Sequence, residues 1–233
     1  MNIKQLPSPN FNERNSPLDA IIIHYTDMLS ADETLKWLCN PASKVSAHYL
    51  IDEDGQIYQL VDEGKRAWHS GESCWQGRND TNSYSIGIEL ANPGHTFGHL
   101  PFPEAQIDAL VSLCEGIMSR WGIPPSRILG HSDVAPRRKQ DPGHLFPWER
   151  LAQAGMGLWP DTDGSPRRDF VPPRNDDSFV IEALEKIGYE TTSPVDALIA
   201  FQRHFQPHKI DGIADLETVA LIQGLLRSQE KLI

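Results

Sequence analysis

Residues 20–25 read AIIIHY, a continuous run of apolar and mostly β-branched side chains that ends at a histidine and a tyrosine. Such a run predicts a strand buried on both faces, because a strand with one face in solvent would alternate polar and apolar residues. Other segments with strand composition are expected at 48–51, 56–61, 84–91 and 127–130. The first two of these flank Asp54-Gly55, which favours a hairpin turn because glycine accepts a positive φ.

Two helical patterns are interleaved with these strands. Ser30 and Glu33 have the spacing of a capping box ahead of residues 34–39. Apolar residues then recur at intervals of three and four from Ile107 to Trp121, which predicts a helix with one apolar face that ends at Gly122. We therefore expect an α/β fold class, in which a mixed sheet is flanked by helices.

A change in composition divides the chain. Residues 159–175 combine four prolines with mixed charges and show no apolar period, which is typical of a linker. Three segments of helical period follow, at 179–187, 194–205 and 216–226. The sequence thus predicts a large domain at 1–160, a Pro-rich linker at 161–175 and a small three-helix domain at 176–233.

Charge and cysteine usage exclude several classes of protein. The chain has 21 Lys and Arg against 32 Asp and Glu, a net charge of −11, so no excess of cations is available to bind a nucleic acid backbone. The three cysteines are widely spaced and show no Cys-x-x-Cys pair, which argues against a disulfide scaffold or a thiolate zinc cluster. With no apolar leader at the N-terminus and no apolar run of membrane-spanning length, we expect no transmembrane segment and a cytoplasmic protein.

Two histidines and one aspartate stand where strands run into loops. His24 lies near the end of AIIIHY, His131 follows the short strand at 127–130, and Asp141 follows ten residues later in a loop rich in proline and glycine. Two imidazoles and one carboxylate leave a fourth tetrahedral position free for water, as a catalytic zinc site requires. Taken by spacing alone, a histidine at a strand end is more often a hydrogen-bonded residue of the core or surface than a metal ligand.

Several motifs in order along the chain resemble one family. IIIHYT, SAHYLID, AWHSG, NSYSIGIELAN, GHSDVAPRRKQDPG and LFPWERLAQAG, across residues 17–160, are similar to the zinc-dependent N-acetylmuramoyl-L-alanine amidases of the AmpD and AmiD kind. The resemblance implies the amidase and peptidoglycan-recognition-protein fold, with one Zn²⁺ per chain held by His24, His131 and Asp141. It further implies that Glu89, in IGIEL, is the catalytic carboxylate and that Lys139 points into the site.

These residue types suit hydrolysis of an amide. Zinc lowers the pKa of a bound water to about 7, which supplies a nucleophile at neutral pH. Glu89 would accept the proton of that water and return it to the leaving nitrogen, and Lys139 would stabilise the developing oxyanion. Without the resemblance, the residues favour an ion-paired carboxylate at a sheet edge for Glu89 and a solvated charge within Arg137-Arg138-Lys139 for Lys139.

Other polar residues are candidates for a substrate cleft or for packing. His48, Trp68 and His69 lie in the family motifs, and Trp68 with His69 offers a sugar or peptide an aromatic face and a donor. The remaining candidates for substrate binding are Arg78, Asn79 and Asn92. We expect His95, His99 and His144, which lie in loops rich in glycine and proline, to be exposed to solvent.

The C-terminal segment resembles the helical peptidoglycan-binding domain through Phe201-Gln202, Asp211-Gly212 and Thr218, but it lacks the usual Asp-Gly turn between the first two helices. A domain that only packs on the larger one is the alternative. The overall prediction is a bacterial zinc amidase that cleaves between the lactyl group of N-acetylmuramic acid and L-alanine, in peptidoglycan or muropeptides, during cell wall recycling. A non-catalytic peptidoglycan-recognition protein of the same fold is the alternative function, and the periplasm or cell envelope is the alternative location.

Overall fold

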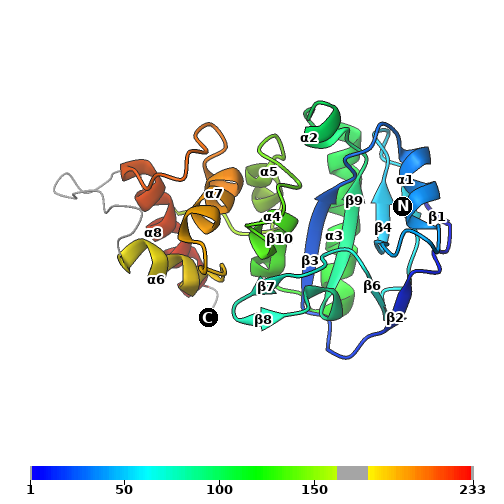
Figure 1. The fold of residues 1–233 in the computed structure, drawn as a ribbon, viewed down its shortest axis with the longest axis horizontal. Coiled ribbons are helices and arrows are strands. Elements are labelled where there is room, and N and C mark those ends of the chain that lie inside the picture. Colours follow the sequence, from blue (N-terminus) through cyan, green and yellow to red (C-terminus); the bar gives the residue numbers. More distant parts are fainter. Residues whose placement is uncertain (1, 162–177, 232–233) are drawn as a thin grey trace.

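The computed structural model describes residues 2–161 and 178–231 (Figure 1). Apart from Asp161, the predicted linker at 161–175 lies outside the described residues. The larger part of the chain forms a central sheet with helices against it, and the three C-terminal helices lie at one end of the molecule, beyond the edge strand of the sheet (Figure 1). None of the described helices is long and apolar enough to cross a bilayer.

The central sheet has six strands and is mixed, which confirms the predicted fold class. Its order is β1 (Ile3–Gln5), β5 (Ile57–Gln59), β4 (Tyr49–Ile51), β9 (Ser85–Leu90), β3 (Ala20–Tyr25) and β10 (Ile128–Gly130). The strands β4, β9, β3 and β10 run parallel, while β4 and β5 form the predicted antiparallel hairpin. The carboxyl ends of four neighbouring strands therefore meet at one edge.

The two faces of the sheet bury different partners, because successive side chains of a strand point to opposite sides. In β3, Ile21 and Ile23 belong to the core that includes helix α3 (Glu104–Trp121) and helix α5 (Trp148–Gln153). Ile22, between them, belongs instead to the core of the C-terminal helices. His24 has the same parity as Ile22, so the alternation of β3 directs it to the face that α3 does not cover.

Local signals account for the helix ends. Helix α1 (Ala31–Leu38) is capped by the Ser30 hydroxyl, which accepts a hydrogen bond from the Glu33 N–H at 3.2 Å. Helix α3 ends before Gly122, whose φ of 66° lies in the left-handed region that favours glycine. The shorter elements were not predicted; they are β2 (Phe11–Glu13), β6 (Lys65–Ala67), β7 (Cys74–Trp75), β8 (Arg78–Asn79), η1 (Thr81–Ser83), α2 (Gly94–Phe97), η2 (Pro125–Arg127) and α4 (His131–Val134).

The three C-terminal helices are α6 (Ser178–Ile187), α7 (Pro194–Phe205) and α8 (Leu216–Glu230), close to the predicted segments. They share one hydrophobic core with the larger part of the chain. Leu184 and Phe201 from these helices pack in the same cluster as Leu129 of β10 and Val134 of α4. The helices thus bury a surface of the sheet domain that would otherwise be apolar and exposed.

Candidate active site

Three of the predicted site residues form a row across neighbouring strands. His24 on β3 is directly opposite Glu89 on β9. Gly130 of β10 is opposite Ile23, so His131, the next residue, comes level with His24. Because these strands are parallel, the row lies at their carboxyl ends, where α/β folds place their sites. His24 and Glu89 are 65 positions apart in the sequence, yet the register of β3 and β9 brings them together.

His24, His131 and Asp141 converge with their donor atoms. The Nδ1 atoms of His24 and His131 lie 3.0 Å apart, and Asp141 Oδ2 lies 2.9 Å from the first and 3.0 Å from the second. All three residues are buried, with exposed fractions of 1%, 2% and 6%. Three buried donors that face one another in this way form a group that can hold a metal ion.

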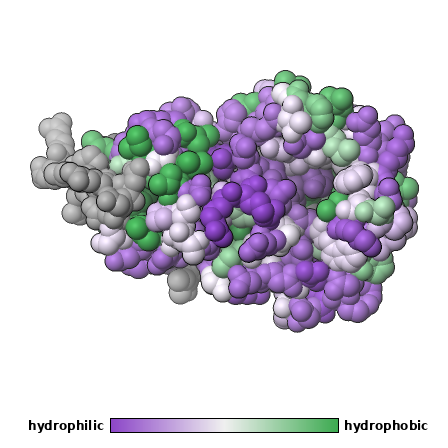
Figure 2. Space-filling view, viewed as in Figure 1, coloured by the Kyte–Doolittle hydropathy of each residue, from purple (hydrophilic) through white to green (hydrophobic). Residues whose placement is uncertain are grey.

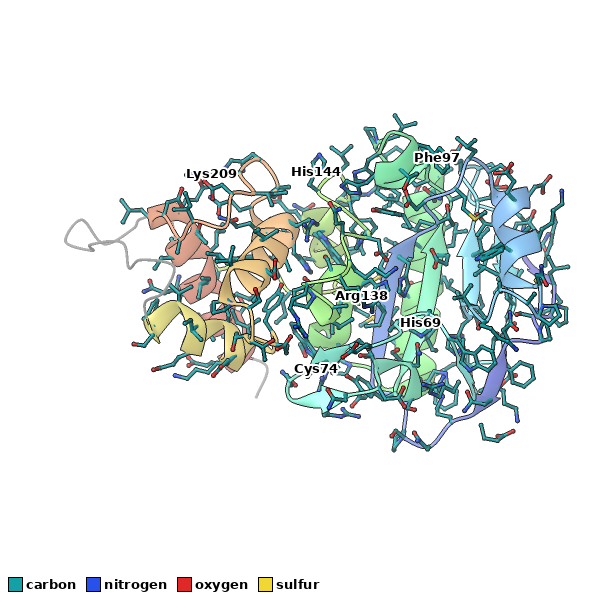
Figure 3. All side chains as sticks on the ribbon, viewed as in Figure 1. His69, Cys74, Phe97, Arg138, His144 and Lys209 are labelled. Atoms are coloured by element: carbon teal, nitrogen blue, oxygen red, sulfur yellow. The ribbon has the colours of Figure 1, made fainter. Side chains whose placement is uncertain are left out.

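The outer nitrogens of the two imidazoles are tied to the protein. His24 Nε2 lies 3.0 Å from His69 Nδ1, and His131 Nε2 lies 2.9 Å from the Ser70 carbonyl oxygen. That carbonyl also accepts a hydrogen bond from Arg138 Nη2 at 2.6 Å. His69 and Arg138 are both seen in front of β3 and β9 in Figure 3. An imidazole that donates its outer N–H to such a partner directs the lone pair of its inner nitrogen toward a metal.

The electrostatics of the group favour the forms that bind metals. Burial and the neighbouring His131 lower the pKa of His24 to about 4. Burial opposes ionisation of Asp141, but His131 and His24 beside it hold its pKa well below the ordinary value. At neutral pH the site therefore offers a neutral imidazole at His24 and an ionised carboxylate at Asp141, the protonation states that a metal requires.

Glu89 faces the same site with a carboxyl oxygen that has no partner. Its Oε2 is enclosed and makes no hydrogen bond to any described residue. Burial and the nearby Asp141 raise the pKa of Glu89 well above its ordinary value, while Lys139 acts in the opposite sense. Lys139 is half-buried in the lining of the same cleft, and its Nζ forms no ion pair with the described residues. A proton acceptor of raised pKa next to a free cation is an arrangement suited to proton transfer.

These groups line a cleft with a volume of about 380 Å³. In the surface view the area over the centre of the molecule is predominantly hydrophilic (Figure 2). Trp68 and His69, both predicted for the cleft, belong to its lining. Sequence reasoning did not single out other lining residues, some of which lie within the quoted motifs; they include Tyr25, Met28, Trp37, Ser46, Arg138 and Gln140. Arg138 was considered only as part of a basic run.

Four predicted substrate contacts lie outside this lining, and the structure shows what each does instead. His48 is 0% exposed and accepts a hydrogen bond from the Gly87 N–H at Nδ1, so it cannot touch a substrate. Arg78 pairs with Asp19 and stacks on Tyr84. Asn92 is buried and its side chain bonds the loop backbone at Leu100 and Gly94.

The fourth, Asn79, lines a neighbouring hollow of about 460 Å³. Arg138 lies between this hollow and the cleft and lines both of them. That hollow contains no convergent set of metal-binding side chains among the residues that the structure describes. The four residues stay predictions as substrate contacts, and one reason explains why they lie outside the lining of the cleft. Proximity in the sequence to a motif does not specify on which side of a strand or loop a side chain lies.

Comparison with known proteins agrees with this geometry. Residues 14–144 match the model of the family described as N-acetylmuramoyl-L-alanine amidase. The amidase AmiD of Escherichia coli is 38% identical over 90% of this chain and 82% of its own length. The 1,6-anhydro-N-acetylmuramyl-L-alanine amidase AmpD of Haemophilus influenzae is 36% identical over 63% of this chain and 89% of its own.

Solved structures give the same result. The complex of AmiD from E. coli with anhydro-N-acetylmuramic acid-L-Ala-D-gamma-Glu-L-Lys superposes with a TM-score of 0.80, at 33% identity, over 94% of this chain and 97% of that one. AmpDh3 from Pseudomonas aeruginosa in complex with anhydromuramic pentapeptide also has a TM-score of 0.80, at 34% identity, over 91% and 92% of the two chains. The likeness includes the C-terminal helices, since residues 1–161 alone would cover less of the chain. The catalytic function is thereby supported over the non-catalytic alternative, and the chain belongs to the N-acetylmuramoyl-L-alanine amidase family.

Proposed function

We propose that this amidase depends on one zinc ion, held by His24, His131 and Asp141. The observation that carries the proposal is the convergence of their three donor atoms within 3.0 Å of one another. Ligands at the usual distances from a tetrahedral zinc ion lie about 3.3 Å apart, so a small outward movement would admit the ion. Two nitrogens and one oxygen are a donor set that zinc accepts while keeping a position for water.

The chemistry that a bound zinc ion supplies is that of a Lewis acid, which lowers the pKa of water and polarises a carbonyl. Glu89 is the proposed proton acceptor, and it would deliver the proton to the alanine nitrogen as the amide breaks, because an amine cannot leave as an anion. The raised pKa of Glu89 suits both steps. Lys139, free of an ion pair within the described chain, is the proposed partner of the oxyanion that forms on the lactyl carbonyl.

For the substrate, we propose muropeptides with an anhydromuramyl or muramyl group next to L-alanine, with polymeric peptidoglycan as a second substrate. Two similar structures hold anhydromuramyl peptides. The polar lining of the cleft suits a glycopeptide, and Trp68, which borders it, offers an aromatic face. The rates of peptide release from the soluble and the polymeric substrate are to be compared by assay.

The division into domains 1–160, 161–175 and 176–233 also remains our proposal, supported by a family match that ends at residue 144. We propose that the C-terminal domain, although it resembles peptidoglycan-binding domains in sequence, stabilises the site by packing against β10 and α4. Its motif residues make internal contacts: the Gln202 side chain accepts hydrogen bonds from the N–H groups of Asp211 and Gly212, at 3.1 and 2.8 Å. Its His204 and Tyr189 bond Asp133, two residues after His131.

The direct test is hydrolysis of 1,6-anhydromuramyl tripeptide and of intact sacculi, with and without a chelator, with free peptide followed by mass spectrometry. We expect release that the chelator abolishes and zinc restores. Failure of chelator-sensitive release on both substrates would refute the proposal.

Two variants separate the proposed roles. Glu89→Gln keeps the shape of the side chain, and we expect it to retain one zinc ion while turnover falls about 100-fold or more. Asp141→Ala removes a ligand, so it should lose the ion of this site together with turnover. Glu89→Gln with full activity would exclude this residue from proton transfer, whatever its zinc content.

A further inference from the structure

A second group of histidines lies beside the active site. His95 belongs to α2, His99 to the loop that follows it, and His144 to the loop after Asp141. One ring nitrogen of each lies within 4.8 Å of the others. His144 lies near the same end of the domain as α2, where Phe97 is found (Figure 3). The sequence alone suggested three separate exposed side chains, and the fold instead brings them together.

His99 is the least explained member of this group. Both of its ring nitrogens are enclosed, and the Pro142 backbone beside the ring can satisfy at most one of them, so at least one nitrogen has no hydrogen-bond partner among the described residues. An imidazole has at least one donor and one acceptor, and burying them without partners costs free energy. Ring packing against Phe102, at 5.9 Å between centroids, accounts for the carbon atoms of His99 but not for its nitrogens.

The backbone makes room for this ring. A side chain at Gly143 would place its Cβ 2.3 Å from His99 Cε1, and Gly143 also has a φ of 83°. The loop that carries both Asp141 and His144 can therefore close over His99 only with glycine at this position. The three rings are held near one another by the same loop that supplies the third ligand of the active site.

Groups of both charges face this cluster, because Arg203 lowers and Asp27 raises the pKa of His95. Burial, with His95 and His144 nearby, lowers the pKa of His99 to about 4, so its ring is neutral at physiological pH. Asp27 lies close enough to raise the pKa values of His95 and His99. Its carboxylate accepts hydrogen bonds from the Thr96 N–H and hydroxyl. The Tyr25 hydroxyl contacts His95 Nδ1, so its oxygen can accept a hydrogen bond from that nitrogen and leave Nε2 as the ligand.

We propose that His95, His99 and His144 bind a second divalent transition metal ion at the rim of the cleft. Three imidazole ligands select zinc, nickel or copper rather than calcium or magnesium, which prefer oxygen ligands. Binding there gives the enclosed nitrogens of His99 a partner. His95 also lines the cleft, and it touches the residue that follows His24, so the second ion would fix one wall of the cleft.

The test is metal stoichiometry in protein without an affinity tag. Metal-free protein is titrated with Zn²⁺, and in parallel with Co²⁺ as a spectroscopic probe, and the bound metal is counted after gel filtration. We expect two ions per wild-type chain, one in His99→Asn/His144→Gln, one in Asp141→Ala and none when these changes are combined. His208→Asn is the matched control, since His208 is an exposed histidine paired with Glu217, and it should keep two ions.

The outcomes separate this proposal from that of the catalytic ion. One ion in the wild type that Asp141→Ala removes would overturn the second site and leave the catalytic one. Two ions retained in His99→Asn/His144→Gln would place the second ion elsewhere and also overturn the proposal. If the double variant is misfolded by circular dichroism, His144→Gln alone is used, and it should weaken binding of the second ion at least tenfold.

Discussion

His69 contacts the proposed zinc ligand His24 but is not itself a proposed ligand. Removal of its side chain therefore tests whether this contact affects zinc binding. The ring of His69 fills the space above Gly87, and its Nδ1 lies 3.0 Å from His24 Nε2. If Nδ1 of His24 faces a zinc ion, its Nε2 carries the proton and donates to His69. In His69→Ala this buried N–H loses its acceptor, and the His24 ring is free to turn.

The expected size of the effect follows from that single contact. An unsatisfied buried donor costs about 1 to 3 kcal/mol. Because the bond is needed to hold His24 in the orientation that binds zinc, this cost appears as weaker zinc binding, about 5- to 160-fold in Kd. The lost volume of the His69 ring changes the zinc affinity itself little, although it lowers the free energy of unfolding.

The assay is competition for zinc between the protein and a chromophoric chelator at fixed pH. His69→Gln is the rescue variant, because its amide oxygen can accept from His24 Nε2, and it should lie close to the wild type. His208→Ala, an exposed histidine in the C-terminal domain, controls for general effects of losing an imidazole. A His69→Ala protein that binds zinc as tightly as the wild type would refute the supporting role, even if its KM changed through the lost cleft surface.

Three further predictions concern the residues around the site and its supporting domain. Asp133→Ala leaves the Gly130 N–H, the Tyr189 hydroxyl and His204 Nδ1 without their shared acceptor, so we expect the free energy of unfolding in urea to fall by about 3 kcal/mol or more; an unchanged midpoint would contradict this. Gly87→Ala would place a Cβ 2.4 Å from His69 Cγ and should weaken zinc binding as His69→Ala does, whereas Gly116→Ala, which meets only the end of Arg120, should not. Burial opposes ionisation of Asp215, but Lys209 and Thr218 lower its pKa to about 2; its capping of α8 is therefore fully present above the unfolded pKa of about 3.9 and is lost as the pH falls through 2. Asp215→Ala should cost about 1 kcal/mol at pH 7, and a difference from the wild type that stayed constant down to pH 2 would be inconsistent with this assignment.

Sequence patterns predicted the elements that carry the chemistry because these elements depend on local signals. The run at 20–25 corresponds to β3, and the pattern from Ile107 to Trp121 lies within α3. The capping box at Ser30 forms as predicted at its hydroxyl. Each of these depends on residues that are neighbours in the chain, so periodicity and caps suffice to locate them.

Elements that depend on distant pairing were not predicted. Strands β2 and β6, of three residues each, are defined by pairing across more than 50 residues and have no period of their own. The same reason explains why His48 was misplaced: its burial depends on Arg14 and Lys65, which contact its Nε2 from other segments. The pairing of Asp133 with His204 also joins parts of the chain that no local pattern connects.

The position of the site nevertheless follows from one property of the sheet. The parallel alignment of β9, β3 and β10 sets Glu89, His24 and His131 side by side, so the proposed proton acceptor and two proposed ligands come from strand ends that the core holds rigid. Only Asp141 comes from a loop, and that loop is anchored by the Ser132 N–H, which donates to the Asp141 carbonyl at 2.9 Å. Helix α4 begins at His131 and packs against α7. The C-terminal helices therefore contact the segment from His131 to Asp141 directly, and we expect their loss to affect the proposed metal ligands as well as overall stability.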